Sequence, residues 1–115
     1  WLMWQMGNFG PMLGRAHYFL FYNPGKAPFA EDWFAAEAKR LYTVLDTLLE
    51  KSEFMAGEYS IADIATFPWA ARHERQRIDL NDYPHVRRWY LAIAARPAVP
   101  KGFAVPGGNI IPMPK

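Results

Sequence analysis

The stretch "EYSIADIATFPWAAR", residues 58–72, decides the fold of this chain. Ser60 stands before an apolar run and Asp63 follows three residues later, which is the spacing of a capping box. In this motif the Ser60 hydroxyl accepts from the backbone N–H of Asp63, and the Asp63 carboxylate accepts from that of Ser60. We therefore expect a helix that begins after Ser60, with a kink where Pro68 removes a backbone donor. We interpret Ser60 and Asp63 as structural residues.

Further helices are expected on both sides of this stretch. Residues 1–22 indicate a helix disturbed by "GNFGPMLG", in which Gly10 and Gly14 allow close packing of a soluble helix pair. The segment "NPGKAP", residues 23–28, predicts a loop. Residues 30–51 predict the clearest helix, because apolar side chains recur at spacings of three and four: Phe34, Ala38, Leu41, Leu45, Leu48 and Leu49.

The remainder of the chain predicts one more helix and a tail. Asp82 is a candidate cap and Pro84 suits an early helical position. The helix that follows places Val86, Trp89, Tyr90 and Ile93 on one side. Residues 96–115 contain five prolines, so we expect an extended, Pro-rich C-terminal tail. No alternating strand pattern is present, and the expected class is an all-α bundle with kinked helices.

Composition excludes several functional classes. The 115 residues allow one domain, and a 51% hydrophobic share argues against disorder. A net charge of +2 with dispersed basic residues argues against nucleic-acid binding. The absence of cysteine excludes disulfides and thiolate chemistry within this chain. His17, His73 and His85 lack paired metal-ligand spacing, so no metal site is expected.

The first 22 residues are apolar but interrupted by polar and glycine residues, which argues against a membrane span. They also lack the basic region and cleavage site of a signal peptide, and the expected location is the cytoplasm. The chain opens on Trp1-Leu2-Met3-Trp4 without an initiator methionine. We therefore expect that a further segment precedes it in the full protein.

Two blocks of sequence carry a resemblance to a known family. "EYSIADIATFPW" followed by "RIDLNDYPHVRRWYLAIAARPAV" resembles the C-terminal helical domain of cytosolic glutathione transferases. "WQMGNFGPMLGRAHYF" is similar to the nu-class group, the glutathione-dependent disulfide-bond reductases of bacteria, and to their fungal relatives. The resemblance implies that residues 1–115 form this helical domain. It also implies a separate thioredoxin-like N-terminal domain, absent from this chain, that binds glutathione and stabilises its thiolate.

The resemblance implies that the helical domain supplies the substrate wall and much of a homodimer interface. No catalytic residue is expected in this chain, and the isolated chain is expected to be inactive. The same stretch has an alternative interpretation, in which Met12, Phe19 and Phe21 belong to the core and the glycines are packing contacts. The predicted wall residues are Asn8, Phe9, Pro11, Met12, Arg15, His17, Tyr18 and Trp33.

Three of these residues depart from the family pattern. Arg15 stands where close relatives often have Gln, and Tyr18 where they often have His. Trp33 stands where many relatives carry an Arg that can meet the glutathione carboxylate. Whether Arg15 replaces that lost charge stays open.

Two functions are therefore expected as alternatives. In the first, the full protein uses glutathione for conjugation or for disulfide or peroxide reduction on a hydrophobic or disulfide co-substrate. In the second, the chain is a non-catalytic helical module for protein–protein docking, since one fold can serve several functions.

Overall fold

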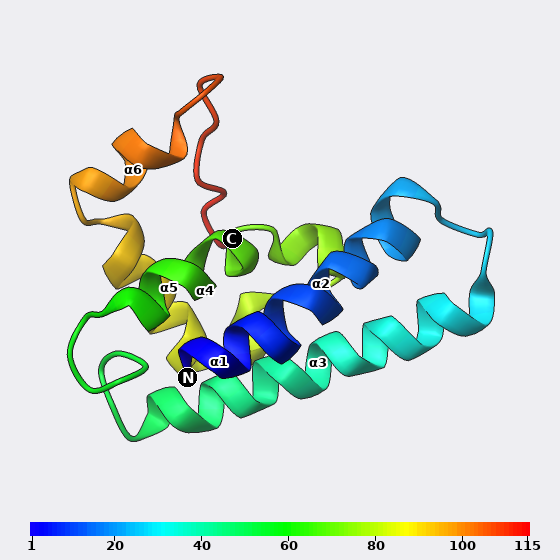
Figure 1. Ribbon diagram of the computed structural model, residues 1–115, viewed down its shortest axis with the longest axis horizontal. Helices are drawn as coiled ribbons and strands as arrows, with labels where there is room; N and C mark the ends of the chain where they lie inside the picture. The colour runs from blue at the N-terminus through cyan, green and yellow to red at the C-terminus, as the bar shows by residue number, and fades with distance from the viewer.

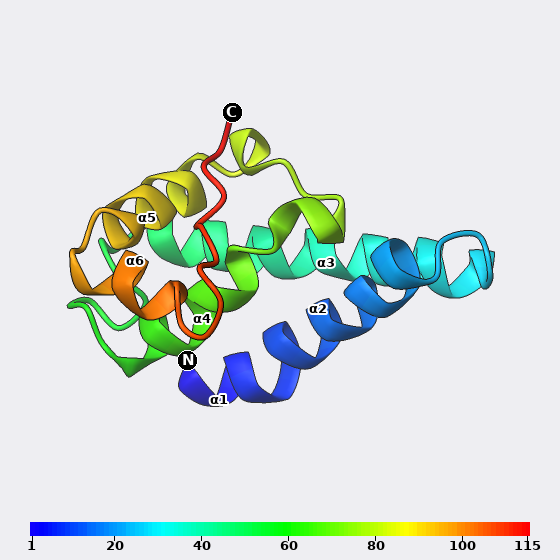
Figure 2. The same cartoon turned by 90° about the horizontal axis from the view of Figure 1, so that it is seen from above.

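The computed structural model describes residues 1–115 and contains helices and loops only, which confirms the predicted all-α class. Two long helical segments form a hairpin that projects to one side, and the later helices gather at the opposite end (Figure 1). The view from above shows the same division (Figure 2). None of the helices is both long and apolar enough to cross a membrane. In chain order the elements are α1 (Leu2–Trp4), η1 (Gln5–Phe9), α2 (Gly10–Ala16), η2 (His17–Tyr22), α3 (Pro28–Glu50), α4 (Ile61–Ala70), η3 (His73–Gln76), η4 (Leu80–Asp82), α5 (Pro84–Ala94) and α6 (Ala98–Phe103).

The elements α1, η1, α2 and η2 form one continuous helix, which we call the first helix. The residues at its internal junctions all have right-handed helical dihedral angles. Its η1 and η2 turns are π-helical and therefore wider than an α-turn. Pro11 follows the first wide turn, which gives room to a ring that would otherwise clash with the carbonyl four residues earlier. The predicted disturbance is thus a change of helical register and not a break.

The first helix packs closely against Trp69 of α4 through its glycines. A Cβ atom built at Gly10 would lie 2.9 Å from Trp69 Nε1 and 3.0 Å from Gln5 Nε2. A Cβ atom at Gly14 would lie 3.4 Å from the nearest Trp69 atom, which is an ordinary contact. The predicted close packing at Gly10 and Gly14 is confirmed, and the partner is one tryptophan side chain.

The start of α4 carries the predicted capping box. The backbone N–H of Ser60 donates to Asp63 Oδ2 at 2.9 Å, and the Ser60 hydroxyl accepts from the N–H of Ala62 at 3.2 Å. Asp63 is fully buried, and its Oδ1 accepts from the N–H of Met55 at 3.0 Å and from Trp89 Nε1 at 2.7 Å. One carboxylate therefore joins the loop before α4, the first turn of α4 and the middle of α5.

The α4 helix contains Pro68 in its interior and still extends to Ala70. Pro68 cannot donate to the carbonyl of Ile64, and its side chain is exposed to solvent. At the end of the helix the N–H of Ala71 donates to the carbonyl of Phe67 at 2.8 Å. The kink at Pro68 stays a prediction.

The helices α3 and α5 cap each other. Asp46 in α3 accepts through Oδ1 from the backbone N–H groups of His85 and Val86, each at 2.9 Å, in the first turn of α5. In return, the guanidinium of Arg88 in α5 donates to carbonyls around the end of α3, those of Leu49, Ser52 and Glu53. Both sets of terminal backbone groups are thereby satisfied across one helix pair.

The predicted cap at Asp82 is wrong. Tyr83 occupies the N-cap position of α5 and makes no capping bond with its side chain. The carboxylate of Asp46 takes that role from 39 residues away in sequence. Pro84 stands at the start of the helix, as predicted.

The main core lies between the first helix, α3, α4 and α5. The predicted stripe of α3 is buried apart from the half-buried Leu48, and all four predicted residues of α5 are buried. Ring pairs link the elements, since Phe9 lies 5.3 Å from Tyr42 of α3 and Phe67 lies 5.0 Å from Tyr90 of α5.

The prediction of an extended tail is wrong for Ala98–Phe103, which form the helix α6. Prolines at the start of a helix need no backbone donor, and Pro97 and Pro100 fall in or before the first turns. The last residues have no regular secondary structure and return across the helices (Figure 1). They are held by the buried Ile111 and by the hydroxyl of Tyr90, which donates to the carbonyl of Pro112.

The two members of the capping box are expected to differ in their effect on stability. Ser60→Ala removes one capping bond and should lower the free energy of unfolding by about 1 kcal/mol. Asp63→Ala leaves three donors without an acceptor, two of them buried, and should lower it by more than about 3 kcal/mol. Urea unfolding of the two variants measures both values. Equal losses would contradict the role given to Asp63.

The two glycines that face Trp69 form a matched pair. Gly10→Ala forces a methyl group against Trp69 Nε1 and should cost about 1–3 kcal/mol of unfolding free energy. Gly14→Ala fits at contact distance and adds helix propensity, so its effect should be neutral or stabilising by up to about 1 kcal/mol. Thermal unfolding of both variants tests the pair. A Gly14→Ala variant as unstable as Gly10→Ala would refute this packing.

Candidate functional site

The exposed face of the first helix carries some of the predicted wall residues. Asn8, Arg15 and Tyr18 are exposed, and Pro11 and Met12 are half-buried. Residues 8, 11, 15 and 18 are spaced by three and four positions, which places them along one side of a helix. A ligand that approached this side would meet an amide, a guanidinium and a phenol.

Phe9 does not belong to this face. Its side chain is completely buried, and its ring lies 5.1 Å from Trp4 and 5.3 Å from Tyr42. The prediction that Phe9 lines a substrate wall is therefore wrong, because no ligand can reach it without opening the core. Phe9 is instead a core residue.

Tyr18 and Trp33 lie at the two ends of a run of four aromatic rings. The ring of Tyr18 lies 5.1 Å from Phe19, Phe19 stacks on Phe34 at 5.4 Å and an interplanar angle of 7°, and Phe34 lies 5.0 Å from Trp33. The inner pair is buried or half-buried, whereas Tyr18 and Trp33 are 57% and 58% exposed. The stacked pair thus fixes the η2 turn to the start of α3, with an exposed ring at each end.

Arg15 lies one turn before Tyr18 and has a free positive charge. Its guanidinium donates only to the carbonyl of Pro11, at 3.4 Å, and no acidic side chain lies within ion-pair distance of it. Asn8 is ten residues before Tyr18, a separation of about 15 Å along a helix. Arg15 and Tyr18 thus lie one turn apart near the hairpin end, Trp33 is connected to Tyr18 through the stacked pair, and Asn8 lies further along the first helix.

His17 faces the opposite side of the first helix from Arg15. Its Nε2 lies 3.1 Å from Nε2 of the buried Gln76, and its ring centroid lies 6.0 Å from that of Trp69. Burial lowers the pKa of His17, a hydrogen bond to the backbone of Arg72 opposes this, and the charges of Arg75 and Arg72 lower it further. His17 is therefore tied to the body of the domain and stays neutral at pH 7.

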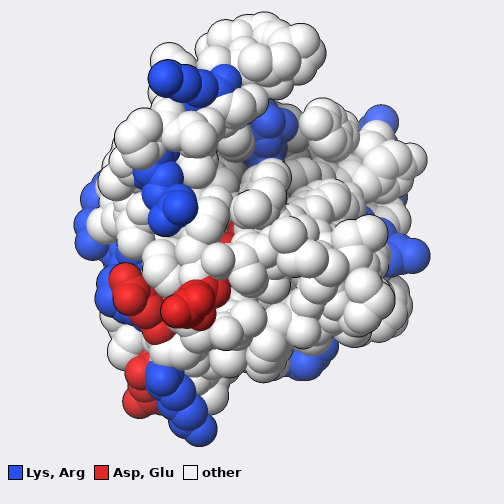
Figure 3. All heavy atoms as spheres, turned by 60° about the vertical axis from the view of Figure 1, so that its left-hand side comes forward, with Lys and Arg blue, Asp and Glu red and all other residues white.

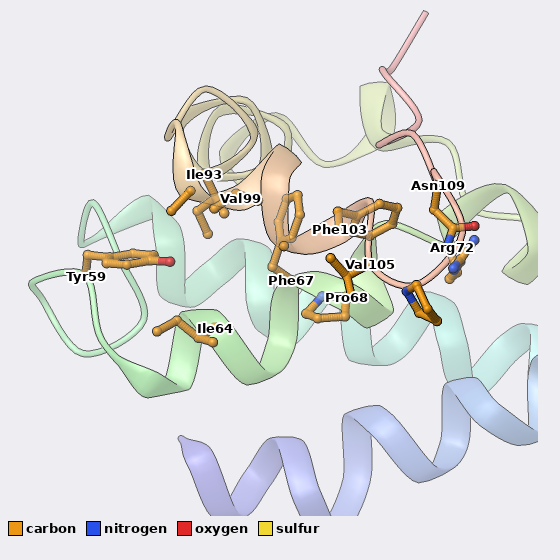
Figure 4. A pocket seen from close by; sticks show the side chains of 13 residues that line it. Tyr59, Ile64, Phe67, Pro68, Arg72, Ile93, Val99, Phe103, Val105 and Asn109 are labelled. Carbon is orange, nitrogen blue, oxygen red and sulfur yellow. The ribbon is translucent and has the colours of Figure 1, made fainter.

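A second surface, which sequence reasoning missed, is a groove of about 620 Å³ between α4, α6 and the tail (Figure 4). Its walls are mostly apolar, with Ile64, Phe67 and Pro68 on α4 facing Val99 and Phe103 on α6. At one end lie the guanidinium of Arg72, 5.4 Å from the ring of Phe103, and Asn109. None of the predicted wall residues lines this groove.

The surroundings of this groove are weakly charged. In the view that brings the α4 and α6 side forward, charged side chains gather mainly toward the edges and most of the middle is uncharged (Figure 3). Ile61 and Ile64 of α4 and Val105 of the tail are exposed on the molecular surface. One wall of the groove is α6, which the prediction of an extended tail excluded, so no sequence signal pointed to the groove.

The grouped residues can bind and orient a ligand but cannot supply a nucleophile. Arg15 offers charge and hydrogen bonds to a carboxylate, and the rings of Tyr18 and Trp33 offer flat apolar contact. The chain has no cysteine, and no three acidic or histidine side chains come together as a metal site.

The comparisons with known proteins agree with this architecture. A family model for the C-terminal domain of glutathione S-transferase matches residues 12–97. The disulfide-bond oxidoreductase YfcG of Escherichia coli is 50% identical over 99 residues, which cover 85% of this chain and 46% of YfcG. The disulfide-bond oxidoreductase YghU of the same organism is 40% identical over 111 residues, which cover 89% of this chain and 38% of YghU. The chain thus spans less than half the length of these curated relatives.

Solved structures show the same relationship. A glutathione transferase from Burkholderia graminis, with two glutathione molecules bound per subunit, matches with a TM-score of 0.81 and 40% identity over 95% of this chain and 49% of that one. A glutathione transferase from Pseudomonas putida, with one glutathione disulfide bound per subunit, matches with a TM-score of 0.81 and 38% identity over 91% of this chain and 49% of that one. The family model covers well over half of the chain. The chain therefore belongs to the glutathione S-transferase C-terminal domain family.

Proposed function

We propose that this chain is the substrate-binding half of a glutathione-dependent enzyme that reduces disulfides or conjugates glutathione to an acceptor. The observation that carries the proposal is the 50% identity to a disulfide-bond oxidoreductase. It is supported by the group of Arg15, Tyr18 and Trp33, which the fold holds in place but does not bury. Similarity to named enzymes favours this function over a non-catalytic docking module.

The residues present fit one side of a glutathione molecule. Glutathione carries two carboxylates and a thiol, and Arg15 offers an unpaired cation to a carboxylate. The exposed rings of Tyr18 and Trp33 offer an apolar wall for an acceptor or for a second glutathione. Bound glutathione would supply the thiolate, and its stabilisation is assigned here to the thioredoxin-like domain outside this chain.

The proposal includes two partners and a location. A thioredoxin-like domain of the same protein would hold most of the glutathione, and a second subunit would form a homodimer. Exposed apolar side chains near both ends of the first helix support such contacts, among them Met3, Met6, Phe21 and Tyr22. Glutathione chemistry and the absence of cysteine are compatible with a reducing compartment, which favours the cytoplasm.

The division of labour can be measured directly. The intact protein should reduce a low-molecular-weight disulfide in a glutathione-dependent reaction, and residues 1–115 alone should show no turnover above the uncatalysed rate. A coupled assay of glutathione oxidation measures both. Turnover by the purified chain alone would refute the assignment of the thiolate to another domain. An intact protein that binds a protein partner but has no glutathione-dependent turnover would favour the docking module.

Arg15 should contribute to affinity and not to folding. Arg15→Ala in the intact protein should raise the Kd for glutathione by about tenfold, because a charge-assisted hydrogen bond is lost, and should leave the Tm nearly unchanged. Arg40→Ala is the matched control, since Arg40 is exposed and pairs only with Glu37 on the same helix. Calorimetric titration and thermal unfolding separate the two effects.

A rescue experiment tests whether Arg15 replaces the charge that the family resemblance implies at position 33. Trp33→Arg introduced into the Arg15→Ala variant should restore most of the lost affinity. Trp33→Phe in the same background should not, since it restores no charge. Equal affinities in the two double variants would show that the charge at this end of the hairpin does not bind glutathione.

A further inference from the structure

Gln76 is a fully buried polar side chain at the meeting point of three elements. The hydroxyl of Tyr42 in α3 donates to its Oε1 at 2.8 Å. Its Nε2 lies 2.8 Å from the carbonyl of Trp69 at the end of α4 and 3.1 Å from Nε2 of His17 in the first helix. The amide therefore uses its acceptor and both of its N–H groups within the domain.

The orientation of this amide follows from one partner. A backbone carbonyl can only accept, so the group facing Trp69 must be the NH₂ end of Gln76. Its oxygen then faces Tyr42, whose phenol stays protonated because burial raises the pKa of Tyr42. The second N–H of Gln76 is left for His17 Nε2, which must be unprotonated in order to accept it. The ring of His17 is therefore neutral and carries its single proton on Nδ1.

The charges around His17 favour the neutral state, whereas its hydrogen bond to the backbone of Arg72 opposes it. Arg72, just before η3, and Arg75, within η3, both carry positive charge that disfavours an imidazolium. The neutral ring of Trp69 in α4 packs against the ring of His17. Tyr42 in α3 is hydrogen-bonded to Gln76, which in turn lies beside His17. A protonated Nε2 would also point its hydrogen at the NH₂ group of Gln76, which cannot accept it.

Gln76 and its neighbour Arg75 tie the η2 turn to the body of the domain at two points. Gln76 bonds to His17, the first residue of η2, and the guanidinium of Arg75 lies 4.7 Å from the centre of the Phe21 ring. Tyr18 lies between these two anchors and is exposed on the other side of the turn. A change at Gln76 therefore acts on the turn that presents Tyr18 through His17.

We propose that Gln76 is a positioning residue for the substrate wall, which acts by holding His17 as the neutral Nδ1–H tautomer and thereby setting the rotation of the η2 turn. This inference rests on the proposed function of the wall. The proposal gives a role to Gln76, which touches no ligand and lies 59 residues after His17 in the sequence.

The first test is the tautomer itself, measured by long-range ¹H–¹⁵N spectra of histidine in the intact protein, with His17 assigned through its loss in His17→Asn. We expect a protonated Nδ1 and an unprotonated Nε2 at neutral pH, and a pKa below the usual 6.5. His73 is an internal reference, because its Nδ1 lies 3.0 Å from the carbonyl of Ile78 and must also carry its proton. A proton on Nε2 of His17 in the unaltered protein would overturn the proposal, whether or not any variant folds.

The second test changes what Gln76 can donate. Gln76→Glu replaces the NH₂ group by an oxygen, so His17 should move its proton to Nε2 and its pKa should rise by about 1 or more. Tyr42→Phe is the matched control, because it removes a buried hydrogen bond but leaves both N–H groups of Gln76. This control should lower the Tm and keep the Nδ1–H tautomer. An unchanged tautomer in Gln76→Glu would contradict the role of Gln76.

The third readout links position to binding. In Gln76→Glu the KM for glutathione or for the disulfide should rise about tenfold, with kcat changed by less than about threefold, because the wall moves and the thiolate site does not. An unchanged KM in a variant whose tautomer has switched would overturn the positioning role. An intact protein with the expected tautomer but no glutathione-dependent turnover would instead refute the proposed function alone.

Discussion

The Asp63 carboxylate is the interaction on which the fold depends. It is fully buried, and three N–H groups from three segments donate to it: those of Met55, Ser60 and the Trp89 side chain. A buried charge without partners is strongly unfavourable, so these segments are held to one arrangement by the need to solvate it. The same carboxylate begins α4, closes the loop before it and fixes the register of α5.

The remaining helices are arranged around this point by side chains that satisfy helix ends. Asp46 and Arg88 each cap the other's helix, which sets how α3 and α5 lie along one another. Trp69 then fills the space left by two glycines of the first helix and brings it against α4. With its inner side held by Trp69 and Gln76, the first helix can present Arg15 and Tyr18 outward without exposing the core.

The sequence predicted several exposed positions of the candidate site but misplaced Phe9. Arg15, Tyr18 and Trp33 were expected at a wall, and all three are exposed, with Tyr18 and Trp33 connected through the stacked rings of Phe19 and Phe34. Phe9 has the apolar character of a wall residue but falls on the inner side, where it shares three- and four-residue spacing with the buried Leu13 and Ala16. Residue type alone does not distinguish the two faces of a helix that is apolar on most sides.

The sequence by itself determined the features that depend on neighbours within one or two turns. These are the capping box at Ser60, the apolar stripe of α3, the loop before α3, which ends at residue 27, and the class of the fold. Only the tertiary structure decided the second partners of Asp63, the cap that Asp46 provides, the helix within the tail and the place of Gln76 beside His17. Periodicity and capping act through adjacent backbone groups and are visible in a linear sequence. Contacts between residues 26 to 59 positions apart are formed only when packing brings the helices together.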